Sequence, residues 1–153
     1  MKIWVDADAC PKAVKEILYR VAERTEIPVT LVANSPLHLP HSSFIHLIQV
    51  GSGADIADDE IADKCEVGDL VITADIPLAA RVVEKGAQAL DPRGTIYDKN
   101  NIGQVLSMRN FMDELRGSGV ETGGPSGFGQ KEKFNFANAL DKFIAQRKKG
   151  DTV

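Results

Sequence analysis

The sequence predicts a single three-layer α/β domain, with a mainly parallel central sheet between two layers of helices. Three observations predict this fold. Short apolar segments alternate with amphipathic ones along the chain. The segment 70–73 is almost entirely apolar, as is typical of a strand buried on both faces. A length of 153 residues suits one domain. Because parallel strands need crossover connections, we expect helices on both faces of the sheet.

The individual elements follow from hydrophobic spacing and from the residues that begin and end them. Pro11 suits the first turn of the first helix, where a backbone N–H would be unpaired. Gly86 is expected to end the third helix, and a glycine-rich loop at 117–129 precedes a basic C-terminal helix. We expect strands at 2–5, 28–32, 44–50, 70–73 and 87–90, and helices at 11–24, 55–64, 77–84, 100–116 and about 132–148.

The composition is that of an ordinary globular protein, with 43% hydrophobic and 26% charged residues. No apolar run approaches the roughly 20 residues that cross a bilayer, so no membrane partner is expected. The N-terminal segment lacks the features of a signal peptide. Cys10 and Cys65 form no spacing motif, which favours a reduced, cytoplasmic protein over a disulfide framework. The composition predicts no particular oligomeric state.

Charge is unevenly distributed along the chain. The net charge is −4, yet the segment from Gly127 onward holds six basic residues and three acidic ones. Two interpretations explain this pattern equally well: a solvated helix at the end of the chain, or a basic flank beside an acidic site. The second interpretation suits a polyanionic partner, such as a nucleic acid, that needs bridging cations.

Several carboxylates follow predicted strands and are therefore expected at one edge of the sheet. The carboxyl ends of parallel strands meet at that edge, where open α/β sheets bind their ligands. On the helix after the third strand, Asp59 lies one turn beyond the first acidic residue, and Asp58 is nearly as close. Asp69 precedes its strand and belongs to the opposite edge. The carboxylates at the carboxyl edge are Asp6 and Asp8 after the first strand, Asp55 after the third and Asp75 after the fourth.

Carboxylates gathered at one edge repel one another, and a hard divalent cation offsets that repulsion. Mg²⁺ and Mn²⁺ prefer carboxylate and water oxygens. Such an ion polarises a phosphodiester and lowers the pKa of an attacking water. We therefore predict catalytic roles for Asp6, Asp55 and Asp75. The alternative is that Asp8 and Asp55 are helix caps. The predicted ligands of Mg²⁺ or Mn²⁺ are Asp6, Asp8, Asp55, Asp59 and Asp75.

Other polar residues are weaker candidates. Thr73 could orient a carboxylate, although it is also an ordinary strand residue. Cys10 lies near the predicted cluster but has no neighbouring base in the sequence, so a nucleophilic role is not favoured. The spacing of the three histidines matches no standard zinc motif. The residues that could contact a phosphate, each more often a plain surface charge, are Lys12, Arg81 and Arg93.

The motifs WVDADACP, GADIADDEIA, GDLVITADIPLAARVVEKGA and DPRG resemble those of the YaiI/YqxD family of bacterial proteins, over residues 1 to about 145. That family is largely uncharacterised, and its fold is grouped with the PIN-like domains, many of which are metal-dependent ribonucleases. The resemblance implies an aspartate after the first strand, acidic residues on a central helix and a Ser/Thr-x-Asp after the fourth strand. These positions correspond to Asp6, to Asp55 with Asp59 or Asp58, and to Thr73-Ala74-Asp75.

Three functional hypotheses follow. The first is a metal-dependent phosphodiesterase of the PIN-like type that acts on RNA, the favoured substrate, or on another nucleic acid. The second is a phosphatase similar to the haloacid dehalogenases, with Asp6 as nucleophile and Asp8 as acid, although Cys10 and Asp69 fit that pattern poorly. The third is a non-catalytic module that binds nucleic acid or nucleotides, although no RNA-binding aromatic signature is visible.

Overall fold

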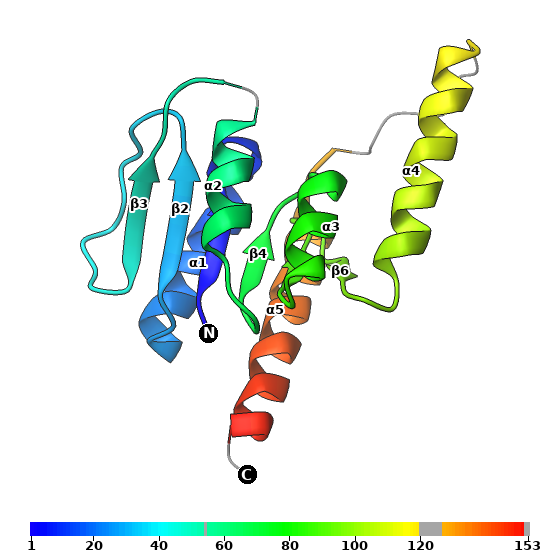
Figure 1. Ribbon diagram of the computed structural model, residues 1–153. Helices are drawn as coiled ribbons and strands as arrows, with labels where there is room; N and C mark the ends of the chain where they lie inside the picture. The colour runs from blue at the N-terminus through cyan, green and yellow to red at the C-terminus, as the bar shows by residue number, and fades with distance from the viewer. Residues whose placement is uncertain (54, 120–126, 152–153) are drawn as a thin grey trace.

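A computed structural model describes residues 1–53, 55–119 and 127–151 and confirms the α/β prediction. One six-stranded sheet has the order β3-β2-β1-β4-β5-β6 (Figure 1). Five of its strands are parallel, and β6 pairs antiparallel with β5 at one edge. The strands are β1 (Ile3–Asp6), β2 (Val29–Ala33), β3 (Ile45–Gln49), β4 (Leu70–Ile72), β5 (Gln88–Leu90) and β6 (Ile96–Tyr97).

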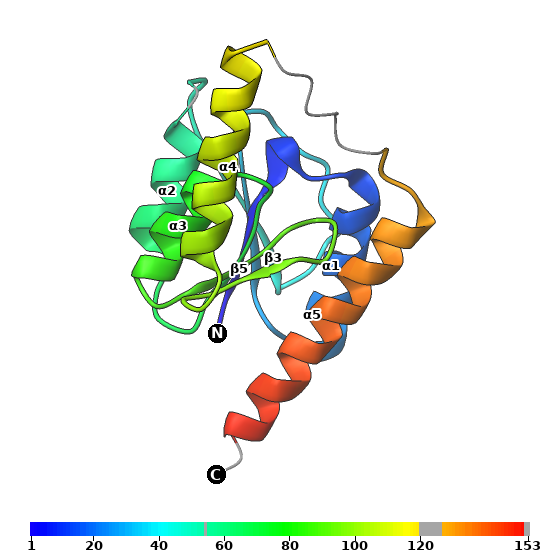
Figure 2. The same ribbon diagram turned by 90° about the vertical axis from the view of Figure 1, so that its right-hand side faces the viewer.

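Helices cover both faces of the sheet (Figures 1 and 2). One face is covered by α1 and α5, whose buried residues include Leu18, Phe136 and Leu140. The other face is covered by α2, α3 and α4, through residues such as Ile61 and Leu78. Burying one such side chain contributes about 1.5–3 kcal/mol. The helices are α1 (Lys12–Thr25), α2 (Ile56–Lys64), α3 (Ile76–Glu84), α4 (Ile102–Gly117) and α5 (Gln130–Asp151), with a 3-10 turn η1 (Ala7–Ala9) before α1.

All five predicted strands and all five predicted helices are present, with small shifts at their ends. Strand β6 was not predicted, because two residues are too short to show a hydrophobic period. Helix α4 is less buried than its apolar pattern indicates: it contains no fully buried residue, and Met108 and Phe111 are exposed. Most of the predicted glycine-rich loop at 117–129 lies outside the described residues.

The strand order places a reversal of direction at the centre of the sheet. From β1 the chain crosses to β2 on one side, and it later returns to β4 on the other. At such a point the crossovers on either side diverge, which leaves a crevice outside the carboxyl ends of the two strands. The ends of β1 and β4 are therefore the part of the sheet most suited to a ligand.

Gly94 brings the β5–β6 turn close to α5. Its φ of +101° is strained for residues with a side chain. A Cβ atom at this position would lie 2.8 Å from the backbone carbonyl of Asn135. The absence of a side chain at Gly94 therefore permits the close approach of the β5–β6 turn to α5.

Candidate acidic site at the carboxyl edge of the sheet

Asp6 is the last residue of β1 and is held by a neighbouring strand end. Its side chain is buried, and the residue is 8% exposed. The hydroxyl of Thr73, just after β4, donates a hydrogen bond of 3.1 Å to Asp6 Oδ2. Burial raises the pKa of Asp6, the Thr73 hydroxyl opposes this rise, and the charges of Asp75 and Asp8 add to it. Asp6 is thus a fixed carboxylate whose charged form the protein leaves poorly compensated.

Asp75 is joined to the same threonine. The Asp75 backbone N–H donates to Thr73 Oγ1 over 3.0 Å. Asp75 Oδ1 accepts the backbone N–H of Leu78 over 3.0 Å, so this side chain caps the N-terminus of α3. Thr73 therefore links Asp6 and Asp75 directly, in agreement with the orienting role that the sequence suggested for it.

A third carboxylate, Asp58, reaches this pair from the first turn of α2. Burial raises its pKa to about 6, with contributions from the charges of Asp75 and Asp6. The hydrogen bond to Asp75 and the charge of Asp55 act in the same direction. Hence Asp58 lies within electrostatic range of both strand-end aspartates.

Asp59 is the metal ligand that the sequence predicts on this helix, but its side chain pairs with an arginine outside the cluster. Asp59 Oδ1 forms an ion pair of 2.9 Å with Arg81 on α3, and both side chains are exposed. Successive residues of a helix point about 100° apart, so only one of two adjacent aspartates can face the strand ends. The structure brings Asp58 to the cluster in place of Asp59, and Arg81 serves as a partner for Asp59.

The remaining two predicted ligands lie around the cluster, and neither makes a capping hydrogen bond with its side chain. Asp8, in η1, accepts the backbone N–H of Asn34 over 2.9 Å. Asp55 occupies the residue before α2 but makes no capping hydrogen bond with its side chain. Asp55 thus occupies the N-cap position that the capping alternative predicts, but without a capping bond from its side chain, whereas Asp8 is not at the N-terminus of an α-helix. Asp75 is the aspartate whose side chain caps a helix.

Protein cations do not neutralise the cluster. Among the described residues, no lysine or arginine forms an ion pair with Asp6, Asp58 or Asp75, and the same holds for Asp8 and Asp55. In that same part of the chain, no three acidic, histidine or cysteine side chains are close enough together to form a ready-made ion site. The carboxylates are thus neighbours that would have to draw closer around a cation.

The other candidate residues are not joined to the cluster by any contact in the described ranges. Lys12 lines a separate cavity with Lys15 and Tyr19. Arg93, in the β5–β6 turn, has its Nη1 atom 3.9 Å from Oε1 of Glu132 on α5. Burial raises the pKa of Cys10 to about 12, which opposes the thiolate that a nucleophile requires.

Asp69 lies at the opposite edge of the sheet, as the sequence predicts, and its carboxylate is buried. It is 4% exposed. Its carboxylate accepts hydrogen bonds from the Lys2 backbone N–H, the Trp4 indole and the Glu66 backbone N–H, at 3.0, 3.0 and 2.9 Å. All of these donors belong to the protein backbone or core, so Asp69 has a structural role.

The raised pKa of Asp58 predicts how the metal-free protein responds to pH. The unfolded chain loses this proton near 3.8 and the folded protein near 6, so the cluster loses stability as pH rises between these values. We expect Asp58→Asn to raise the melting temperature in EDTA at pH 7.5, and this gain to shrink at pH 4.5. Thermal unfolding of both proteins at the two pH values measures it; an identical difference at both would contradict the prediction.

These features define a three-layer α/β protein with an uncompensated acidic cluster where β1 and β4 end. Residues 4–146 match the family described as "Uncharacterized BCR, YaiI/YqxD family". The chain belongs to this family, which confirms the family resemblance seen in its motifs.

Curated relatives agree with this assignment and extend over nearly the whole chain. A protein named UPF0178 protein from Maridesulfovibrio salexigens is 59% identical over 146 residues, covering 95% of this chain and 97% of the relative. UPF0178 proteins from Janthinobacterium sp. and Cronobacter sakazakii are 60% and 58% identical, covering 98% and 97% of this chain and 100% and 99% of their own. No solved structure matches. None of the helices in the described ranges has the length and hydropathy of a membrane span.

Proposed function

We propose that this protein is a metal-dependent nuclease of the PIN-like type that hydrolyses phosphodiester bonds, with RNA as its substrate. The observation that best supports the proposal is the grouping of Asp6, Asp58 and Asp75 at the ends of β1 and β4, with no cationic partner among the described residues. The mutual repulsion of these carboxylates lowers the stability of the metal-free protein, which favours a functional role for them.

The donor set fits a hard divalent cation. Carboxylate oxygens are the ligands preferred by Mg²⁺ and Mn²⁺. Asp6, Asp58 and Asp75 would hold the ion, with Asp8 and Asp55 beside them. When bound, such an ion polarises a phosphodiester and lowers the pKa of water.

The chain itself positions these ligands. The Thr73 hydroxyl donates a hydrogen bond to Asp6 Oδ2 and accepts one from the backbone N–H of Asp75. The two strand ends therefore keep a fixed relative orientation. The α3 cap at Leu78 occupies Asp75 Oδ1 and leaves the second oxygen of Asp75 directed by that bond. Such fixed positioning of ligands is what a metal-dependent hydrolase requires.

Cleavage of a labelled single-stranded RNA in Mn²⁺, with EDTA as the control, tests the proposal. We expect Asp6→Asn and Asp75→Asn each to lower cleavage at least about 100-fold, because each removes a charged ligand of the ion. Wild-type rates in both variants, or equal cleavage in EDTA, would overturn it. A phosphoryl adduct trapped on Asp6 would support the phosphatase hypothesis instead, and RNA binding without turnover would support the binding module.

A further inference from the structure

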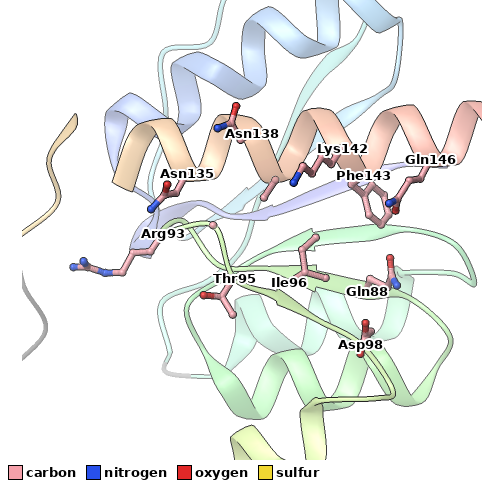
Figure 3. A pocket seen from close by; sticks show the side chains of 12 residues that line it. Gln88, Arg93, Thr95, Ile96, Asp98, Asn135, Asn138, Lys142, Phe143 and Gln146 are labelled. Carbon is pink, nitrogen blue, oxygen red and sulfur yellow. The ribbon is translucent and has the colours of Figure 1, made fainter. Parts of the chain in front are cut away.

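A long polar groove separates α5 from the edge of the sheet formed by β5 and β6 (Figure 3). A cavity of about 600 Å³ extends along it from Gly94 and Asn135 to Gln146. A second cavity, of about 490 Å³, continues to Gly68 and Arg147. The two share Gln88, Asp98 and Phe143, so they form one continuous depression. We call it the α5 groove.

We propose that the α5 groove binds the backbone of a single-stranded RNA, an inference that rests on the nuclease function proposed above. Lys142 on α5, Lys99 after β6 and Arg147 near the end of α5 all line the groove. None of the three forms an ion pair with a carboxylate of the described residues. Such cations attract phosphates.

The acidic residues of the groove are occupied by other partners. Asp98 accepts the backbone N–H groups of Asn100 and Asn101, at 2.8 and 3.2 Å. Asp69 is buried and accepts three hydrogen bonds, as described above. These bonds leave both aspartates charged, but Lys99, Lys142 and Arg147 outnumber the two carboxylates among the lining residues. On a chain with a net charge of −4, the α5 groove is therefore a local concentration of positive charge.

The shape and lining of the groove suit one strand. Asn135 and Arg147 are 12 positions apart on α5, which is about 18 Å at 1.5 Å per residue. The exposed amides of Asn135, Asn138 and Gln146 can donate to and accept from bases and riboses. Figure 3 shows these side chains along one wall and Gln88, Thr95 and Ile96 along the other. Phe143 lies between the two cavities, where a base could stack on its ring.

The end of the groove at Gly94 and Asn135 lies at the same edge of the sheet as the acidic cluster. The groove begins at the turn after β5, and β5 is the strand next to β4. At their carboxyl ends the two strands are joined by the Thr73 N–H bond to the Leu90 carbonyl, of 3.1 Å. An RNA strand that runs along the groove toward the N-terminus of α5 therefore approaches the edge of the sheet where Thr73 and Asp75 lie.

Fluorescence anisotropy with a labelled single-stranded RNA of about 12 nucleotides, in EDTA, tests the groove without catalysis. We expect Lys142→Gln to weaken binding about fivefold and to reduce the slope of log affinity against log salt by about 0.7, as loss of one phosphate contact does. Asn138→Asp, an exposed and nearly isosteric change, should weaken binding similarly by repulsion. The control is Arg20→Gln, which removes one exposed charge from α1, outside the groove.

The outcomes separate this inference from the nuclease proposal. RNA binding that both groove variants impair, without any cleavage, would support the groove and overturn the nuclease. Metal-dependent cleavage with wild-type binding in Lys142→Gln and Asn138→Asp would overturn the groove and leave the nuclease intact. Absence of RNA binding by the wild type, or equal competition by duplex RNA, would also overturn the single-strand proposal.

Discussion

Asp58→Asn should lower Mn²⁺-dependent RNA cleavage at least about 100-fold, whereas Asp59→Asn should leave it within about threefold of the wild type. The two substitutions remove the same charge from adjacent residues of α2. Asp58 interacts electrostatically with Asp75 and Asp6, while Asp59 pairs with Arg81 on the surface. An exposed ion pair of this kind contributes about 0–1 kcal/mol to stability, so its loss should not unfold the protein.

Initial rates at saturating Mn²⁺, on protein whose folding is checked by circular dichroism, measure this difference. Because the amide that replaces the carboxylate cannot ionise, the Asp58→Asn protein should be at least as stable as the wild type in EDTA at pH 7.5. Loss of activity accompanied by unfolding would therefore contradict the account, as would equal losses in the Asp58→Asn and Asp59→Asn proteins.

Asp69→Ala should destabilise the protein by about 3 kcal/mol or more. The substitution leaves three donors without their acceptor: the backbone N–H groups of Lys2 and Glu66 and the indole of Trp4. The Trp4 indole and Asp69 are buried, so water cannot readily replace the lost bonds. These donors join the start of β1, the segment after α2 and the start of β4, so the effect should be on global stability.

Urea unfolding monitored by Trp4 fluorescence measures this change, with Asp63→Ala, an exposed aspartate of α2, as the control. Under conditions where it is folded, the Asp69→Ala protein should cleave RNA at the wild-type maximal rate when RNA is saturating, because Asp69 lines only the far end of the α5 groove and lies at the edge of the sheet opposite the acidic cluster. A stability loss under about 1 kcal/mol would show that the buried carboxylate matters little.

The fold could be predicted from the sequence because its strands and helices differ clearly in hydrophobic period. The stripe Phe136, Leu140 and Ile144 is buried on α5, as expected from its spacing. The same reasoning predicted that Asp6 and Asp75 share one edge, since that follows from parallel topology alone. The exposure of α4 was not predictable, because an apolar pattern does not reveal whether a partner surface lies beside it.

The details of the site depend on tertiary geometry that a sequence does not contain. The choice between Asp58 and Asp59 depends on how α2 is rotated about its axis against the sheet. Whether an aspartate before a helix acts as a cap depends on a local turn: Asp75 accepts the Leu78 N–H, and Asp55 accepts no such bond. The α5 groove is formed by segments far apart in the chain, around Arg93, Lys99 and Lys142.

Anomalous scattering from a crystal soaked in Mn²⁺ tests the central claim most directly. The account predicts a manganese peak bound by the carboxylates of Asp6, Asp58 and Asp75, which would draw together around the ion, and no such peak in crystals of the Asp6→Asn protein. A crystal soaked to equilibrium in Mn²⁺ that shows no manganese peak between the ends of β1 and β4 would contradict the account.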